Sequence, residues 1–432
     1  MYASTLNIIV RSLSITLVIS LSVFFTLTQA ICAENADQDN PVIGINVPLS
    51  GPYKQLGQDQ LNAYKLAIER TNEQGGVLGK KIEYKVKDTQ TDPRVAKKNA
   101  LQLINEDQAV MLTGGSSSSV AMAQSDVCQK QGVIFMAAMT HSSATTGFMV
   151  KEGQYGEQKA HRHTFRWHFN AWMTQKALNP YLRQEIGGGK DYFYITVDYT
   201  WGHSLESAFQ HATESAGSDT VGSVNTKLGQ KNFAEAVQKA KEADPDILVL
   251  TLFGRGMIRA AKQVHEMGLD KDTQVIIPSM ELNAAHEIGP ETLKNVISTT
   301  QWFWGLEDKY SGSKKFVNLY RSRYNKPPGQ SAASAWTAFH EWISAVERAE
   351  SFSSGEVIKA LEGHTFELLK DEEKWRSWDH QAISSVYVVQ GKSRENMRNE
   401  WDLIKILDKA EGMDIVRSRK ENPVMLEPLE SE

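Results

Sequence analysis

A strand, a short loop and a helix follow one another between Val42 and Gly79, and this order constrains the fold more than any other segment. The strand is the nearly continuous apolar run Val42–Leu49, and the turn Ser50-Gly51-Pro52 follows it. The helix Leu61–Arg70 then carries apolar side chains at 3.6-residue spacing. A continuous apolar strand is typical of a parallel sheet that is buried on both faces, so the segment predicts an α/β fold. Its loop would lie at the carboxyl end of a strand, where open α/β sheets bind ligands.

The same alternation of strand and helix continues along the chain and predicts βαβ units around parallel sheets. Further strands are expected at Lys81–Lys87, Ala109–Thr113, Val133–Ala138, Tyr192–Val197, Ile247–Leu252 and Val275–Pro278. Further helices are expected at Pro93–Asn105, Ser119–Lys130, Ser204–Ala216, Asn232–Glu242 and Met257–Met267. The chain is longer than one typical domain, and the order seen at its start recurs from Tyr192 onward, so two similar α/β lobes are expected.

Residues 1–33 have the pattern of a secretory signal peptide. Arg11 precedes the apolar run Leu13–Leu27, and small residues follow, with cleavage expected after Ala30 or Ala33. A retained membrane anchor is the alternative that the length of the run leaves open. Ile31 in front of Cys32 argues against a lipoprotein site. The mature protein is therefore expected to be soluble in the periplasm.

Composition and motifs exclude several classes of function. Lys and Arg number 47 against 52 Asp and Glu, and no basic patch or aromatic RNA motif appears, so no nucleic-acid partner is expected. Cleavage after Ala33 would leave Cys128 as the one cysteine, which excludes an internal disulfide. The histidines at 161, 163 and 168 fit no zinc motif and are expected to be solvated. No phosphate-binding loop or nucleophile elbow is present, so neither a cofactor nor a metal is expected, and the protein is not expected to be an enzyme.

The opening pattern resembles a known family. Ser-Gly-Pro, a helix, Asn72-Glu73-Gln74-Gly75-Gly76 and then Gly79-Lys80-Lys81-Ile82 are similar to the periplasmic leucine/isoleucine/valine-binding proteins. These are the type I solute-binding components of branched-chain amino acid ABC transporters. The resemblance implies the type I periplasmic binding protein fold, in which two Rossmann-like lobes with parallel sheets are joined by three crossover segments.

The resemblance also implies where the chain divides. Lobe 1 would comprise 41–166 plus 300–368, and lobe 2 would comprise 167–299 plus 376–406. The crossovers would fall near Phe165–Asn170, Ile297–Trp304 and Phe366–Asp379. Residues 409–432 form a charged C-terminal tail, either weakly ordered or an extra surface segment.

Two loops of lobe 1 are the first candidate ligand-binding elements. The turn Thr113–Ala121 precedes a helix, and a helix N-terminus can hold a carboxylate. Without the family, a turn capped by one serine is the alternative. The resemblance places Ser118 at the serine that holds the ligand carboxylate, with Ser117 and Ser119 as its neighbours in register.

The second of these loops runs from Ala137 to Thr146. In the family, main-chain groups and a threonine here grip the ligand, which points to Met139, Thr140 and His141. His141 stands at the position of that threonine. This departure from the family pattern leaves the ligand's identity open, and a solvated or structural histidine is the alternative.

Lobe 2 supplies three more candidates by resemblance: Trp201 and Phe253 as aromatic contacts and Glu281 as the carboxylate for a ligand ammonium. An ordinary exposed glutamate is the alternative for Glu281. Trp302 and Trp304, at the second crossover, would either stack on a ligand or pack in the hinge.

These observations predict a periplasmic solute-binding protein that captures a small amino-acid-like or amide-like solute between its lobes. The many aromatic candidates favour an aromatic solute. An inner-membrane ABC permease is the expected partner, and the protein is expected to be a monomer. A ligand-sensing receptor of the same fold is the alternative, and a hydrolytic enzyme is a third hypothesis.

Overall fold

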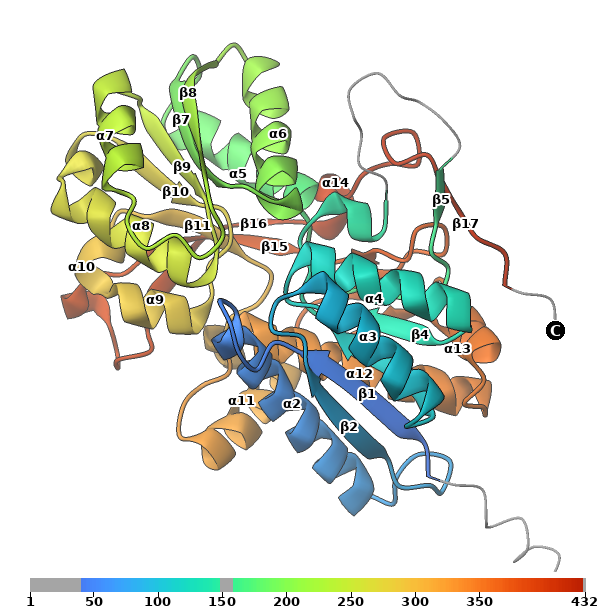
Figure 1. Ribbon diagram of the computed structural model, residues 1–432. Coiled ribbons are helices and arrows are strands. Elements are labelled where there is room, and N and C mark those ends of the chain that lie inside the picture. The colour runs from blue at the N-terminus through green and yellow to red at the C-terminus, as the bar shows by residue number, and fades with distance from the viewer. Residues whose placement is uncertain (1–39, 148–157, 430–432) are drawn as a thin grey trace, which may run out of the picture. The chain divides into compact units, whose positions relative to one another are not determined.

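The computed structural model describes residues 40–147 and 158–429. The predicted signal peptide, with Cys32, lies outside these residues. Two β-sheets with helices packed on them make up most of this part of the chain (Figure 1). Within it, no helix is both long enough and apolar enough to cross a membrane.

The first sheet has the strand order β2-β1-β3-β4-β6, and all its pairs are parallel. Its strands are β1 (Val42–Val47), β2 (Glu83–Asp88), β3 (Ala109–Gly114), β4 (Ile134–Ala137) and β6 (Thr164–Arg166). The connecting helices are α2 (Lys54–Glu73), α3 (Pro93–Asn105) and α4 (Ser118–Gln131). Asp92 caps α3 by accepting the N–H of Arg94 at 2.7 Å, as the Asp-Pro pair in the sequence indicates.

The second sheet has the strand order β16-β15-β11-β10-β9-β7-β8. Its strands are β7 (Asp191–Val197), β8 (Asp219–Thr226), β9 (Ile247–Thr251), β10 (Gln274–Ile277), β11 (Ile297–Thr300), β15 (Val386–Gly391) and β16 (Ile404–Ala410). Its helices are α5 (Ala171–Glu185), α6 (Thr200–Glu214), α7 (Ala234–Ala243), α8 (Gly254–Glu266), α9 (Leu282–Ile288) and α10 (Pro290–Leu293). The pairs β11–β15 and β15–β16 are antiparallel, so this sheet is mixed and not parallel throughout.

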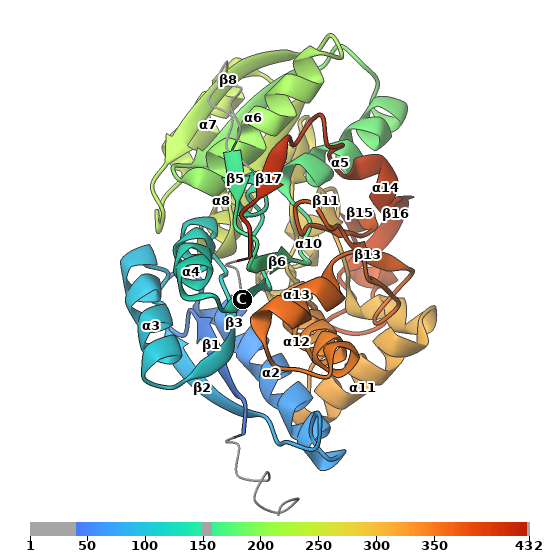
Figure 2. The same cartoon turned by 90° about the vertical axis from the view of Figure 1, so that its right-hand side faces the viewer.

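Between β11 and β15 the chain returns to the first sheet. Helix α12 (Gln330–Ala349) packs along α2, and α11 (Ser311–Tyr324) and α13 (Ser354–Leu361) lie beside it (Figure 2). A small antiparallel sheet follows, made of β12 (Thr365–Phe366), β13 (Glu373–Trp375) and β14 (Ala382–Ile383). Short 3₁₀ helices cover Ser143–Thr145, Leu269–Lys271, Trp304–Asp308 and Arg394–Asn396.

The C-terminal segment carries secondary structure of its own. Helix α14 (Gly412–Ile415) follows β16, and β17 (Val424–Leu426) pairs in parallel with β5 (Gln158–Ala160). Asn422 donates its side-chain amide to Asp379 at 2.9 Å, which ties this segment to the small-sheet region. Residues 409–429 therefore form an extra surface segment, which is the second of the two alternatives given for the C-terminal tail.

Three helices begin at least three residues earlier than the sequence predicts. Helix α2 begins at Lys54 and not at Leu61. Helix α6 begins at Thr200 and not at Ser204, and α8 begins at Gly254 and not at Met257. None of these three starts has a side-chain cap, which is the signal that marks a helix start in sequence. Trp201 consequently lies in the first turn of a helix and not in a loop.

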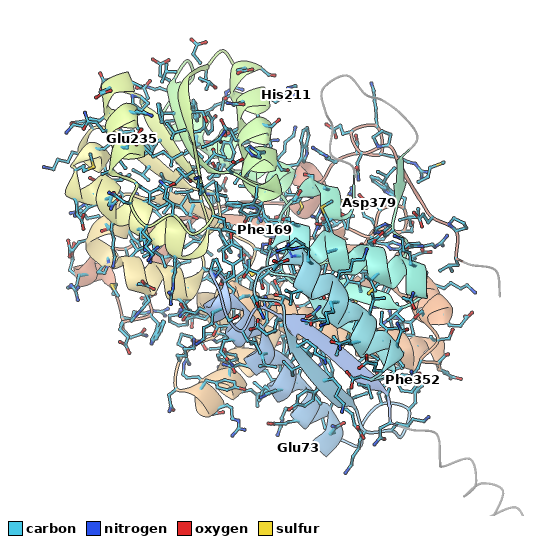
Figure 3. All side chains as sticks on the ribbon, in the orientation of Figure 1. Glu73, Phe169, His211, Glu235, Phe352 and Asp379 are labelled. Atoms are coloured by element: carbon cyan, nitrogen blue, oxygen red, sulfur yellow. The ribbon has the colours of Figure 1, made fainter. Side chains whose placement is uncertain are left out.

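Gln301 joins the three segments that connect the two sheets. Its Oε1 accepts the backbone N–H of Phe169 at 2.7 Å, and its Nε2 donates to the carbonyl of Trp167 and to Ser384 Oγ, both at 2.9 Å. Figure 3 shows Phe169 between the elements of the first sheet and those of the second. Gln301 is fully buried, so one side-chain amide satisfies polar groups from all three connections.

Replacing Gln301 with leucine should destabilise the protein by about 2–4 kcal/mol, because it leaves the Phe169 N–H and the Trp167 carbonyl buried without a partner. Urea unfolding followed by circular dichroism measures the change. Gln238→Leu, at an exposed position of α7, is the control and should alter stability by less than about 0.5 kcal/mol. Equal stability of the two variants would contradict the role given to Gln301.

Candidate functional site

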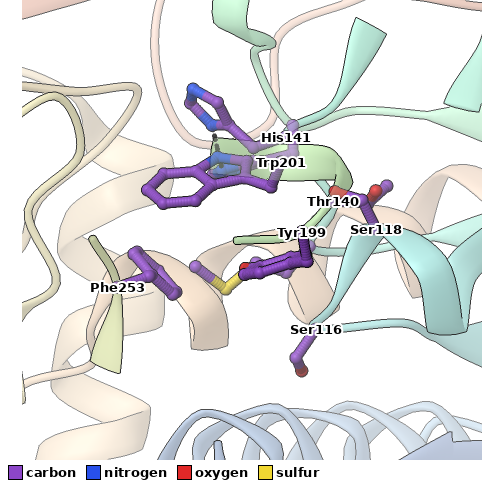
Figure 4. Close-up of a pocket in the computed structure, with 9 residues that line it drawn as sticks. Ser116, Ser118, Thr140, His141, Tyr199, Trp201 and Phe253 are labelled. Atoms are coloured by element: carbon purple, nitrogen blue, oxygen red, sulfur yellow. Dashed lines mark hydrogen bonds between the residues drawn. The ribbon is translucent and has the colours of Figure 1, made fainter. Parts of the chain in front are cut away.

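A pocket forms where the carboxyl-end loops of the first sheet face those of the second (Figure 4). Residues from the β3–α4 and β4 loops and from the β6–α5 connection lie on one side, and residues after β7 and β9 lie on the other. Its lining consists of Ser116, Ser118, Met139, Thr140, His141, His168, Tyr199, Trp201 and Phe253. No carboxylate is among these residues.

The first sheet contributes hydroxyl donors. Ser118 Oγ accepts the backbone N–H of Ser142 at 3.2 Å, so its own proton is free to bond to a solute. Ser116 Oγ likewise accepts the Gln60 amide at 2.6 Å. Both serines stand at the start of α4, whose N-cap, Ser117, makes no capping bond with its side chain. The free hydroxyl protons and the uncapped backbone N–H groups beside them can donate hydrogen bonds to an oxygen atom of a bound solute.

Two histidines form a hydrogen-bonded chain beside the serines. Thr174 Oγ1 donates its one proton to the carbonyl of Asn170 at 3.1 Å. It can therefore only accept in its second contact, with the N–H of His141 Nε2 at 2.7 Å. His141 Nδ1 is then unprotonated and accepts from His168 Nε2 at 3.3 Å. This leaves His168 Nδ1 as a buried acceptor without a partner among the described residues.

Both imidazoles are neutral across the physiological range. Burial lowers the pKa of His168 to about 3, and the nearby Arg166 guanidinium acts in the same direction. Burial is the main cause that lowers the pKa of His141 well below its usual value, and the Arg166 guanidinium acts in the same direction. The histidines thus serve as hydrogen-bonding groups and not as charges. The expectation of solvated histidines is wrong for His163 and His168, which are both buried.

The second sheet contributes an aromatic wall. Tyr199 and Trp201 lie with ring centroids 6.2 Å apart and planes inclined by 28°, and Phe253 lies 5.6 Å from Trp201. Tyr53, from the first sheet, closes the wall: its hydroxyl is 2.7 Å from that of Tyr199, and its ring meets Phe253 edge-on at 5.7 Å. Such a wall favours a flat, unsaturated partner.

Gly254 allows this close approach. It has φ +57°, and a Cβ at this position would lie 3.0 Å from the Tyr53 ring. Glycine adopts this backbone conformation without strain and leaves room for the tyrosine.

The free volume of the pocket, about 20 Å³, is about that of one water-sized sphere. A solute therefore enters only when the two sets of loops separate or the aromatic rings turn.

The structure brings together six of the nine residues that the sequence singles out: Ser118, Met139, Thr140, His141, Trp201 and Phe253. Ser117 and Ser119 lie next to the pocket, and their hydroxyls face each other at 3.1 Å. Glu281 lies apart from the six, on a second cavity of about 370 Å³ that Tyr53 and Phe253 also line.

Glu281 is buried and not exposed. The side-chain amide of Gln330 and the backbone N–H of Ser331 both approach its carboxyl at 3.4 Å. Burial, with a contribution from the negative charge of Asp59, raises the pKa of Glu281 to about 8. At neutral pH this group is therefore mostly uncharged, which weakens it as an anchor for an ammonium.

Sequence reasoning did not identify Ser116, His168 and Tyr199. Ser116 belongs to the turn Thr113–Ala121 that the sequence singles out, but the resemblance to the family points only to Ser118 and its neighbours Ser117 and Ser119. Tyr199 adjoins Trp201, but no sequence signal shows that the helix begins at Thr200. Trp302 and Trp304 lie outside the pocket and donate their indole N–H groups to Ser313 and to the Trp401 carbonyl, in keeping with hinge packing.

Comparison with known proteins gives consistent results. The family model for periplasmic binding proteins matches residues 42–396. A leucine-, isoleucine-, valine-, threonine- and alanine-binding protein of Pseudomonas aeruginosa is 22% identical over 331 residues, which cover 76% of this chain and 84% of the relative. A periplasmic binding protein from Burkholderia mallei superposes with a TM-score of 0.81 at 22% identity, covering 89% of this chain and 98% of that one.

A solute-binding protein of an ABC transporter from Rhodopseudomonas palustris, solved in complex with 3,4-dihydroxybenzoic acid, superposes with a TM-score of 0.76 at 20% identity. The match covers 87% of this chain and 98% of that one. At this level of identity the structural likeness shows the fold, which confirms the predicted type I architecture. The family model covers most of the chain and confirms a solute-binding role in place of an enzymatic one. The chain belongs to the periplasmic binding protein family.

Proposed function

We propose that this protein is the exported solute receptor of an ABC importer and that it binds its solute in the pocket between the two sheets. The two sheets with their helices act as the two lobes, and the nine residues that line the pocket contact the solute. Family membership and the predicted signal peptide support export to the periplasm and delivery to an inner-membrane permease.

The solute has a carboxylate or amide head and a flat, unsaturated body. The observation that carries this proposal is the pairing of free hydroxyl donors at the start of α4 with the wall of Tyr199, Trp201 and Phe253, in a pocket without a carboxylate. A head that accepts hydrogen bonds suits Ser118 and the backbone N–H groups beside it. The body would stack on the aromatic wall. The neighbour that binds 3,4-dihydroxybenzoic acid supports this class of solute.

The solute needs no ammonium group. The predicted ammonium partner, Glu281, lies on the second cavity and is mostly uncharged at neutral pH. An α-amino acid would therefore bring its ammonium into a pocket that offers no charged partner, and burying such a charge costs several kcal/mol.

Titration calorimetry with benzoate, benzamide, phenylalanine and leucine tests the proposal. Benzoate or benzamide should bind, and phenylalanine should bind more weakly than either. Trp201 fluorescence should change with the same saturation curve, because the ring lines the pocket. Binding of the two amino acids alone, or conversion of any of these compounds into a product, would overturn the proposal.

Ser118→Ala should weaken binding about 10- to 150-fold, because it removes one hydrogen bond to the head of the solute, worth about 1.5–3 kcal/mol if the head is charged. Calorimetry with the best ligand of the panel measures the loss. Ser117→Ala is the control on the same turn, since its hydroxyl faces Ser119, and it should retain most of the affinity. The same affinity in both variants would remove Ser118 from the site.

Glu281→Gln should leave the affinity for benzoate nearly unchanged, since the proposed solute has no ammonium for this residue to hold. A sharp loss of affinity in this variant would instead support an amine-bearing solute.

The same variant should alter the pH dependence of stability. The pKa of Glu281 is raised on folding, so its favourable contribution is complete below its ordinary value of 4.5 and is lost as pH rises to about 8. Relative to the wild type, Glu281→Gln should thus gain stability on the order of 5 kcal/mol between pH 4 and pH 9. Urea unfolding at pH 4, 6.5 and 9 measures this. A stability difference that stays constant with pH would show that Glu281 is ionised in the fold.

A further inference from the structure

A basic groove lies beside the solute pocket. It has a volume of about 400 Å³ and runs between the β1–α2 loop of the first sheet and two segments of the second sheet, 227–233 and 252–259, the latter including the start of α8. Phe253 lines both the groove and the solute pocket, so the two spaces share one wall. A solute that reaches the pocket from this side passes over the groove.

The groove carries a concentration of positive charge. No aspartate or glutamate lines it, and the cationic residues in its lining are Lys54, Lys227, Lys231, Arg255 and Arg259. Within residues 40–147 and 158–429 none of these five forms an ion pair, although Arg259 donates to the Gln230 carbonyl at 3.3 Å. Four of them, Lys54, Lys227, Lys231 and Arg255, are exposed side chains.

Two carboxylates outside the lining of the groove, Asp88 and Asp198, have hydrogen-bonding partners of their own. Asp88 accepts the backbone N–H of Leu49 at 2.8 Å and the hydroxyl of Ser50 at 2.6 Å, and so fixes the first-sheet loop. Asp198 pairs with His203 at 2.8 Å. The chain as a whole has a net charge of −5, so the groove is positive against the overall charge of the protein.

We propose that this groove captures an anionic solute and steers it into the pocket, so that of the two proposed heads, carboxylate and amide, the solute carries the carboxylate. The inference rests on the proposed function, because it assigns a class to the solute of the same pocket. A cleft lined by charges of one sign raises the local concentration of the opposite ion and its association rate. Charge at the rim acts mainly on the association rate, and salt screens it.

Stopped-flow tryptophan fluorescence tests the inference, with benzoate as the anionic probe and benzamide as its neutral counterpart. The groove variant combines Lys54→Gln, Lys227→Gln and Lys231→Gln. The control variant combines Lys98→Gln, Lys374→Gln and Lys405→Gln, which removes the same charge from exposed lysines that have no ion pair in the described part of the chain.

At low ionic strength the groove variant should bind benzoate on the order of tenfold more slowly than the control variant, with an unchanged dissociation rate. Benzamide should associate with both variants at the same rate, and near 1 M salt the difference for benzoate should disappear. Equal benzoate rates in the two variants would overturn the steering role while leaving the proposed function intact. If benzamide binds and benzoate does not, the carboxylate assignment is wrong. If neither probe binds, the proposed class of solute is wrong, and the inference about the groove is wrong as well.

Discussion

The buried side-chain amide of Gln301 is the interaction on which the arrangement of the two sheets depends. It bonds to the backbone of Trp167 and Phe169 in the first connection and to Ser384 in the third, while itself belonging to the second. Three chain segments that are far apart in sequence therefore share one hydrogen-bonding centre that is closed to water. Hydrogen bonds of a buried side-chain amide are directional, so those of Gln301 fix how the connecting segments lie beside one another.

The pocket lies next to this centre, and the segments that Gln301 holds position two of its lining residues. His168 is next to Phe169, the residue whose N–H Gln301 accepts, and His141 packs on the Phe169 ring at 4.4 Å. The histidine chain is thus held at the junction of the sheets and not by a mobile loop alone. Tyr53 and Tyr199 add one hydroxyl contact between the two sides. Separation of the loops, which solute entry requires, breaks that contact and leaves the Gln301 centre in place.

The pocket is lined by neutral groups, whereas charged side chains and a buried carboxyl lie around it. The pocket holds neutral hydrogen-bonding groups and aromatic rings. The exposed groove beside it holds cations that form no ion pair with any described residue, and the buried carboxyl of Glu281 lies on a separate cavity. Neutral donors bind a head group without the desolvation cost of a buried countercharge. Charges at the solvent-exposed rim act over distance instead. This division suits rapid capture and reversible release of an anion.

The sequence alone determined the α/β class, the strands β1 to β4, β7, β9 and β10, and six of the residues that line the pocket, because each follows from local periodicity or from a motif that resembles a known family. It missed the early starts of α2, α6 and α8, because none of them has a capping side chain. It included Glu281 by aligned position, yet burial and Asp59 change the charge of that group. Only the tertiary structure decided that His168 and Tyr199 join the site and that five cations meet in one groove, because these contacts link residues whose separation along the chain carries no periodic signal.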